Sequence, residues 1–358
     1  MKKFMLFSML TIGILASYSG KANIPDKEVL RAYELRMNGK VDDAKKLLET
    51  VLVKDSTNAM AHYEMARLKH YLLTGGGGIR IDDILVSINK AVLYDPQNVT
   101  YAYYKGIVEF LNAFMSMQTG SGEVRKKIEV TCSQFKKVLS MKPDYYEAGL
   151  YLVEIYGMLP KDMGGDSLKA NEYAAKLEAT GKYFGYRAKA VVAVKEGDRL
   201  RFWTERLSKE SKNPELLMEV GKAYLNQDDL ENAEKYFNDA AKSDPSKNVL
   251  ILDLARYNML VVMQNKDLAS KNLPIAKKYL ENYLKSNPEP VIPLKAYALG
   301  LLTHTEMFMG NKEEADKLMA EAKSLDPYFS RAMGVPTLLL FDSPDHISHH
   351  FFSFFTPF

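Results

Sequence analysis

Residues 215–245 read ELLMEVGKAYLNQDDLENAEKYFNDAAKSDP and contain two apolar patterns separated by a short polar turn. In each pattern the apolar residues recur three and four positions apart, which predicts two amphipathic helices. Small residues at Gly221 and Ala233 would let these helices approach closely, while Tyr224 and Phe237 would fill the space between them. The segment therefore predicts a helix–turn–helix hairpin.

This hairpin resembles the unit of the tetratricopeptide repeat (TPR) family, which is a 34-residue helix–turn–helix. The matching positions are Leu217, Val220, Gly221, Tyr224, Ala233, Phe237, Ala240 and Pro245. The same spacing recurs along the chain and indicates about eight hairpins between residues 25 and 327. The resemblance implies an all-α fold, a right-handed TPR solenoid over residues 23–327, in which each hairpin buries its apolar face against its neighbours.

The first 22 residues have the composition of a targeting segment. A basic start, MKK, is followed by the apolar run FMLFSMLTIGILA at residues 4–16 and by small residues that suit cleavage. This pattern predicts a signal peptide at residues 1–22 and an exported protein, periplasmic if the source is a Gram-negative bacterium. An uncleaved anchor is the alternative reading. No cysteine lies near the cleavage region, which argues against a lipid anchor.

The charge balance excludes some classes of partner. The chain of 358 residues has 48 basic and 45 acidic residues, and three of its lysines lie in the predicted signal peptide. The mature chain is therefore neutral and gives no electrostatic reason to expect binding to nucleic acid or to an anionic membrane. Its single cysteine, Cys132, lies on a helical pattern and is predicted to be a buried, inert thiol.

The repeat pattern stops after Pro327. Residues 328–358, YFSRAMGVPTLLLFDSPDHISHHFFSFFTPF, form a non-repeat apolar C-terminal tail with three prolines and a cluster of phenylalanines. His346, His349 and His350 are the residues closest to a metal-ligand set, but a zinc site needs ligands that converge from a fixed scaffold. We therefore expect no metal and no cofactor.

Four consecutive glycines, Gly75–Gly78, invite comparison with a phosphate-binding loop. Such a loop follows a buried strand and carries lysine and a hydroxyl at fixed positions, whereas Arg80 and Ile81 stand where those residues would be sought. The glycines fall at the turn inside the second hairpin, where glycine supplies positive φ. The sequence favours a structural turn over an anion site.

A second glycine turn occurs in MLPKDMGGDSLKANEYAAKLEA, residues 158–179. The run GGD before KAxxY is similar to segments in the TPR-containing periplasmic partner proteins of TRAP-type solute transporters. That resemblance implies an envelope or transporter partner, a solute-binding protein, and a possible ligand pore.

No catalytic motif is present: the chain has no GxSxG, HExxH or CxxC sequence. We therefore expect a non-enzymatic scaffold, which binds a protein or peptide partner in the concave groove lined by the first helix of each hairpin. The alternative is a small-molecule-handling accessory protein of a solute transporter. Repeat register predicts that the groove is lined by Tyr63, Arg67, His70, Tyr103, Phe110, Met218, Lys222, Leu225, Arg256, Met259, Tyr297, His304 and Met307.

Overall fold

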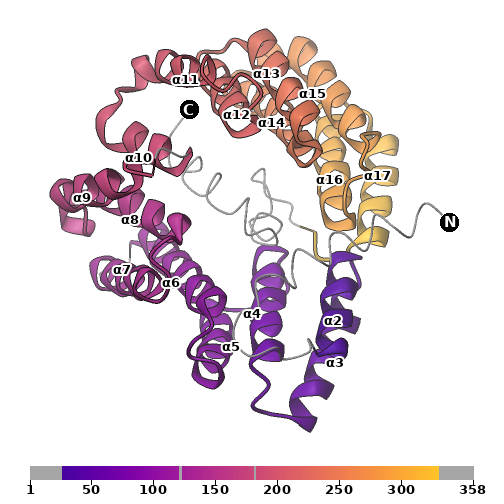
Figure 1. The fold of residues 1–358 in the computed structure, drawn as a ribbon. Coiled ribbons are helices and arrows are strands. Elements are labelled where there is room, and N and C mark those ends of the chain that lie inside the picture. Colours follow the sequence, from indigo (N-terminus) through magenta and orange to yellow (C-terminus); the bar gives the residue numbers. More distant parts are fainter. Residues whose placement is uncertain (1–25, 121–122, 181–182, 330–358) are drawn as a thin grey trace. The chain divides into compact units, whose positions relative to one another are not determined.

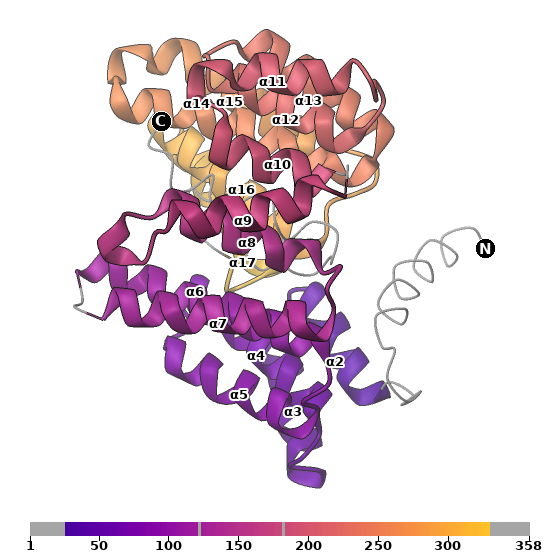
Figure 2. The same ribbon diagram turned by 60° about the vertical axis from the view of Figure 1, so that its left-hand side comes forward.

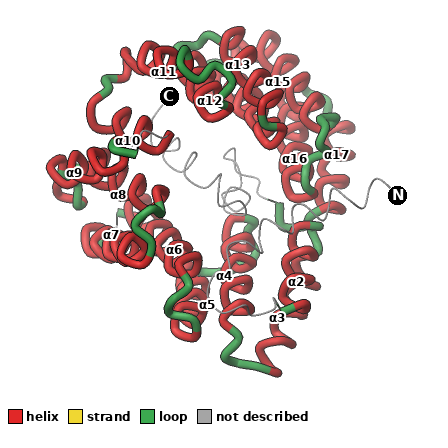
Figure 3. The backbone as a smooth tube through the Cα atoms, in the orientation of Figure 1, coloured by secondary structure: helices red, strands yellow, loops and turns green. Residues whose placement is uncertain are grey.

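The structure, a computed structural model, describes residues 26–120, 123–180 and 183–329. All regular elements of these residues are helices, and sixteen α-helices follow one another as helix–turn–helix pairs (Figures 1 and 3). The predicted all-α TPR-type solenoid of eight hairpins is thereby confirmed. The predicted signal peptide, residues 1–22, and residues 330–358 of the predicted tail lie outside the described part of the chain.

The chain divides into two compact units. The first unit ends at Ala170, and the second begins at Asn171, inside helix α9. The short segment Met37–Gly39 belongs to the second unit. The helices of the first unit are α2 (Lys27–Met37), α3 (Val41–Lys54), α4 (Ala59–Thr74), α5 (Ile81–Tyr94), α6 (Val99–Thr119), α7 (Val124–Met141), α8 (Tyr146–Met158), the 3-10 helix η1 (Lys161–Met163) and the start of α9 (Ser167–Glu178).

The second unit contains the last four hairpins. Its α-helices after α9 are α10 (Tyr183–Ala193), α11 (Arg199–Leu207), α12 (Pro214–Leu225), α13 (Leu230–Ser243), α14 (Ile251–Gln264), α15 (Ala269–Leu284), α16 (Ile292–Phe308) and α17 (Lys312–Leu325). Short 3-10 helices stand at Glu196–Asp198, Pro245–Leu250 and Lys266–Leu268. Phe329, just beyond α17, is buried against Ala296 and Leu299 of α16.

In two hairpins the helices approach each other closely at a glycine. In the hairpin of α12 and α13, a Cβ atom on Gly221 would lie 2.5 Å from the ring of Phe237. In that of α6 and α7, a Cβ atom on Gly106 would lie 2.8 Å from the ring of Phe135. Figure 2 shows α6 and α7 lying side by side along their lengths. In these two hairpins a glycine on the first helix therefore makes room for an aromatic ring on the second.

The tetraglycine forms the turn between α4 and α5, as predicted. Gly76 and Gly78 have φ angles of +76° and +71°, in the left-handed region that glycine adopts without strain. Gly75 ends α4 by donating its N–H to the carbonyl oxygen of Tyr71 at 3.0 Å. A helix precedes this turn, so the strand that a phosphate-binding loop requires is not present before it.

Asparagine residues begin several first helices. The Oδ1 atom of Asn58 accepts the N–H of Ala61 at 2.9 Å, and that of Asn98 accepts the N–H of Tyr101 at 3.2 Å. Each asparagine stands three residues after an aspartate, Asp55 or Asp95, that ends the previous hairpin. This spacing closes one hairpin and caps the next, because Asn is among the preferred N-cap residues.

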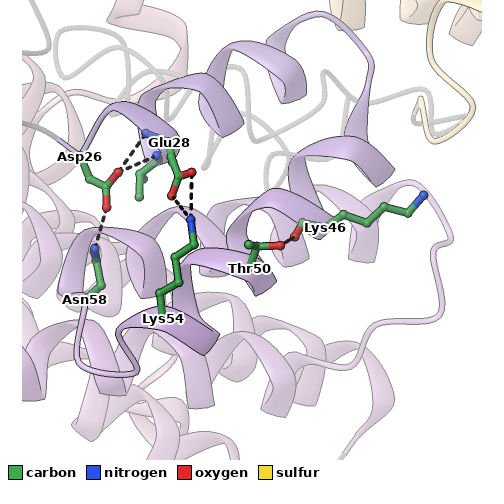
Figure 4. A network of polar contacts seen from close by, with 7 residues as sticks. Asp26, Glu28, Lys46, Thr50, Lys54 and Asn58 are labelled. Carbon is green, nitrogen blue, oxygen red and sulfur yellow. Dashed lines mark hydrogen bonds and ion pairs between the residues drawn. The ribbon is translucent and has the colours of Figure 1, made fainter.

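Polar contacts join the first two hairpins (Figure 4). Asp26 caps α2 by accepting the N–H of Glu28 at 2.9 Å, and its other carboxylate oxygen accepts the side-chain amide of Asn58 at 2.9 Å. Lys54 at the end of α3 donates to both carboxylate oxygens of Glu28 at 3.2 Å. The cap of α2 is thus hydrogen-bonded to the cap of α4.

Gly221→Leu is expected to lower the stability of the protein by about 1–3 kcal/mol, because the new side chain would overlap the Phe237 ring in a packed interior. The midpoint of urea unfolding measures this change. Gly197→Leu is the matched control, since no atom lies within 4 Å of a Cβ at Gly197. Equal losses in both variants would contradict the packing argument.

Candidate functional site

The thirteen residues predicted to line a partner-binding groove differ widely in exposure. Four retain accessible surface: Lys222, Arg256 and His304 are half-buried, and Met307 is 60 % exposed. The other nine are buried, namely Tyr63, Arg67, His70, Tyr103, Phe110, Met218, Leu225, Met259 and Tyr297. In this conformation the buried side chains offer no surface to a partner. Their role in the predicted groove would be to pack beneath it.

In the first unit, Arg67 belongs to a buried ion-pair triad. The Nε atom of Arg36 on α2 lies 2.7 Å from Oε1 of Glu64, and Nη1 of Arg67 lies 3.2 Å from Oε2 of the same carboxylate. The ring of Tyr33 lies 5.4 Å from the guanidinium carbon of Arg36 and 5.3 Å from that of Arg67. This geometry ties α2 to α4 through charge and cation–π contact.

His70 is fully buried beside this triad. Its Nδ1 atom lies 3.0 Å from the hydroxyl oxygen of Tyr104 on α6. Burial, assisted by the positive charge of Arg36, lowers the pKa of His70 to about 3. The imidazole is therefore neutral at physiological pH and links α4 to α6.

Tyr103 and Phe110 belong to an aromatic cluster in the first unit. The Tyr103 ring lies 5.9 Å from that of Phe135, and the Phe110 ring lies 6.0 Å from that of Tyr151. Phe135 and Tyr151 stack with their ring centres 4.6 Å apart. These contacts join α6, α7 and α8, so the two predicted groove residues pack in the core.

The second unit brings charged side chains of several first helices together. We call Tyr183, Arg187, Glu219, Lys222, Asp253 and Arg256 the polar face. Tyr183 on α10 donates its hydroxyl to Oε1 of Glu219 on α12 at 2.6 Å, and Nε of Arg187 lies 3.8 Å from that oxygen. The polar face therefore includes a direct connection between the fifth and sixth hairpins.

Arg256 connects the next two hairpins. Its guanidinium forms an ion pair with Asp253 one turn earlier on α14, and it is hydrogen-bonded to Tyr297 on α16. Its side chain is 15 % exposed, and that of Asp253 is 12 % exposed. The buried Nη1 atom of Arg256 has no hydrogen-bond partner among the described residues. The hydrogen-bonding capacity of this arginine is thus only partly satisfied within the protein.

Burial controls the electrostatics of the polar face. It lowers the pKa of Lys222, although the nearby carboxylates of Glu219 and Asp253 act in the opposite direction. Burial also opposes the charge of Arg256, but Asp253 and Tyr297 outweigh it and raise the pKa of this arginine. Burial and the adjacent Glu219 raise the pKa of Tyr183 well above its ordinary value. The polar face therefore holds charges at a recessed, partly desolvated surface.

Four residues of the polar face were not among the predicted groove residues: Tyr183, Arg187, Glu219 and Asp253. Glu219 stands three residues before Lys222, and Asp253 stands three residues before Arg256, so both were one helical turn from a predicted position. Tyr183 and Arg187 lie on α10, a helix for which the sequence predicted no groove residue. The i,i+3 spacing of acid and base on α12 and α14 was the available signal.

Residues 26–120, 123–180 and 183–329 contain no group of three histidine, cysteine, aspartate or glutamate residues placed to hold a metal ion. The histidines at 346, 349 and 350 lie outside these ranges. Within the same ranges, no helix combines the length and apolar character needed to span a membrane. Cys132 is buried, as predicted, and burial raises the pKa of its thiol.

Comparison with known families identifies one repeat. Residues 214–247, the hairpin of α12 and α13, match the tetratricopeptide repeat family. No curated protein matches the chain. The repeat identity that the sequence suggested for this hairpin is therefore confirmed.

Solved structures with similar folds are distant. The human IFIT1 dimer with PPP-AAAA is 16 % identical, with a TM-score of 0.35, and the match covers 82 % of this chain and 81 % of that one. The TPR domain of P58(IPK) is 16 % identical, with a TM-score of 0.26, covering 84 % of this chain and 83 % of the other. These values carry no argument about function.

His70 is expected to make stability depend on pH. Its pKa in the folded protein, about 3, lies below the ordinary value of 6.5, so protonation favours the unfolded chain between these values. The free energy of unfolding should fall by about 1.4 kcal/mol per pH unit from this group as the pH drops from 6 to 4.

Urea unfolding of the wild type and of His70→Gln at pH 4, 5 and 6 measures this contribution. Glutamine can still hydrogen-bond to Tyr104 but does not bind a proton in this range. The difference in stability between the two proteins should therefore shrink or reverse as the pH falls. A constant difference across the three pH values would show that His70 does not titrate as proposed.

Proposed function

We propose that this protein is a non-enzymatic, exported TPR scaffold that binds a protein or peptide partner through the polar face of its second unit. TPR repeats generally act as protein-interaction scaffolds, and residues 214–247 carry such a repeat. The observation that carries the proposal is the set of partly buried charges that successive first helices contribute, including Lys222 and Arg256.

The composition of the polar face favours a peptide. It holds three bases, Arg187, Lys222 and Arg256, and two acids, Glu219 and Asp253, so donors and acceptors stand next to each other. A peptide presents both kinds of group along its backbone and side chains. A nucleic acid presents a row of phosphates and requires a clear excess of positive charge. The nearly balanced polar face therefore suits a peptide whose carboxylate meets Lys222 or Arg256.

Partial burial would make such contacts selective. A charged group that is already partly desolvated loses less water when a partner covers it, and its interaction with an opposite charge is screened less than at an open surface. Because Asp253 already forms an ion pair with Arg256, the guanidinium is also oriented before a partner binds. The balanced charges of the polar face favour a protein or peptide partner over the alternative, an accessory protein of a solute transporter.

Lys222→Gln combined with Arg256→Gln is expected to weaken partner binding at least tenfold, because each substitution removes a charge but keeps the side chain polar and of similar length. Partners are identified by co-purification from the envelope fraction and mass spectrometry, and their affinities are then measured by calorimetry. Lys242→Gln with Lys278→Gln is the matched control, since both lysines are exposed on second helices. Equal retention of the same partners by all three proteins would refute the proposed role of the polar face.

Export is supported by the basic start and the apolar run of residues 1–22. Expression of the full chain in a Gram-negative host should yield a periplasmic protein whose N-terminus begins after Ala22, as determined by mass spectrometry of the intact protein. A chain that keeps Met1 and stays with the cytoplasmic fraction would contradict export.

A further inference from the structure

The first unit contains a cleft that the proposed function does not use. It has a volume of about 810 Å³ and lies between α7 and the segment that connects α8 to α9. Its lining includes Ile128, Cys132 and Lys136 from α7, and Lys161 and Lys169 from the connecting segment and α9. Ligand pockets of small molecules commonly have volumes of about 300–1,000 Å³, so the cleft is of suitable size.

The connecting segment holds one wall of the cleft in a fixed shape. Gly165 donates its N–H to the carbonyl oxygen of Pro160 at 2.9 Å, and Asp166 donates its N–H to that of Tyr156 at 2.8 Å. A Cβ atom at Gly165 would lie only 1.8 Å from the carbonyl oxygen of Leu159, so no other residue fits there without a backbone shift. Gly164, with φ of +107°, reverses the chain. The GGD turn thus builds this wall.

The floor of the cleft is neutral and mainly apolar. Ile128, Cys132 and Tyr156 line it and are 1 %, 3 % and 7 % exposed. Burial raises the pKa of the Cys132 thiol, which therefore remains protonated and uncharged. These three side chains close the bottom of the cleft without placing a charge there, and Leu159 and Leu168 of the lining expose apolar surface.

The rim of the cleft carries excess positive charge. Among the lining residues, Arg125 pairs with Glu129 at 3.2 Å and Lys169 pairs with Asp166 at 2.8 Å. The two further cations in the lining, Lys136 and Lys161, are exposed and form no ion pair with any described residue.

The position of Lys136 is partly set by an aromatic ring. Its Nζ atom lies 5.6 Å from the centre of the Tyr156 ring. The Nζ atom of Lys169 lies 5.4 Å from the centre of the same ring. Cation–π contact of this kind holds an ammonium group near the floor while leaving its remaining donors available to another group.

We propose that this cleft binds a small anionic molecule, with a carboxylate or phosphate group at Lys136 and Lys161 and a short apolar body against Leu159 and Leu168. The two lysines supply the charge that the anion requires, and the two leucines supply apolar contact. The site is independent of the polar face, which belongs to the second unit.

Calorimetry of the full mature chain with two probes tests this site. Hexanoate carries a carboxylate and phenyl phosphate carries a phosphate, and hexanamide is the uncharged counterpart. At least one anionic probe should bind saturably with a stoichiometry near one, and hexanamide should bind at least tenfold more weakly. The stronger anionic probe identifies the head group. Absence of saturable binding of both anionic probes would overturn the proposal.

Variants locate the binding. The double substitution Lys136→Ala and Lys161→Ala should lower the affinity for the anionic probe at least tenfold, because two charge-assisted contacts are lost. Ser133→Trp, at an exposed position in the lining, should block the cleft without disturbing the core. Lys137→Ala, which is also exposed on α7 but does not line the cleft, is the matched control and should bind as the wild type does. Equal affinity in all four proteins, or equal weakening by Lys137→Ala, would place the binding elsewhere and overturn the proposal.

Discussion

In two hairpins, one in each unit, a close contact between a glycine on the first helix and an aromatic ring on the second sets how near the paired backbones lie. Gly221 against Phe237 and Gly106 against Phe135 bring the backbones of paired helices together. With the backbones fixed at this distance, the opposite faces of the first helices are left to carry other side chains. Glu219 and Lys222 of the polar face lie on α12, and Tyr104, which contacts His70, lies on α6.

The two units use charged residues of similar spacing in different ways. In the first, Arg36, Glu64 and Arg67 are buried and hold α2 to α4. In the second, Arg187, Glu219, Lys222, Asp253 and Arg256 retain part of their surface and remain partly desolvated. Removing one partner of a buried triad leaves an uncompensated charge, so the first set serves stability. The second set keeps enough surface to meet a partner.

The glycine turns also differ in what they do. Gly76 and Gly78 adopt positive φ and have open space around the position of a Cβ atom, so they serve the reversal of the chain between α4 and α5. A Cβ atom at Gly165 would overlap the carbonyl oxygen of Leu159, and the turn that this glycine forms is one wall of a cleft. A run of glycine therefore has a meaning that depends on which atoms stand next to it.

Sequence by itself determined the hairpins, their order and the turn at Gly75–Gly78, because helix periodicity, small residues at packing positions and capping residues are local properties. It also placed Lys222 and Arg256 on first helices. It could not determine the exposure of the predicted groove residues. Burial of His70, Tyr103 and Phe110 depends on side chains of neighbouring hairpins, such as Tyr104 and Tyr151.

For the same reason, the sequence did not predict the polar face as a whole or the cleft. Glu219 reaches Tyr183 across 36 positions of the chain, and Lys136 reaches Tyr156 only because α7 and α8 pack together. The energies that decide these sites, desolvation and pairing of charge, depend on distances between elements that no local pattern encodes. Only the tertiary structure fixes those distances, and with them the surfaces that this protein can offer to a partner or a ligand.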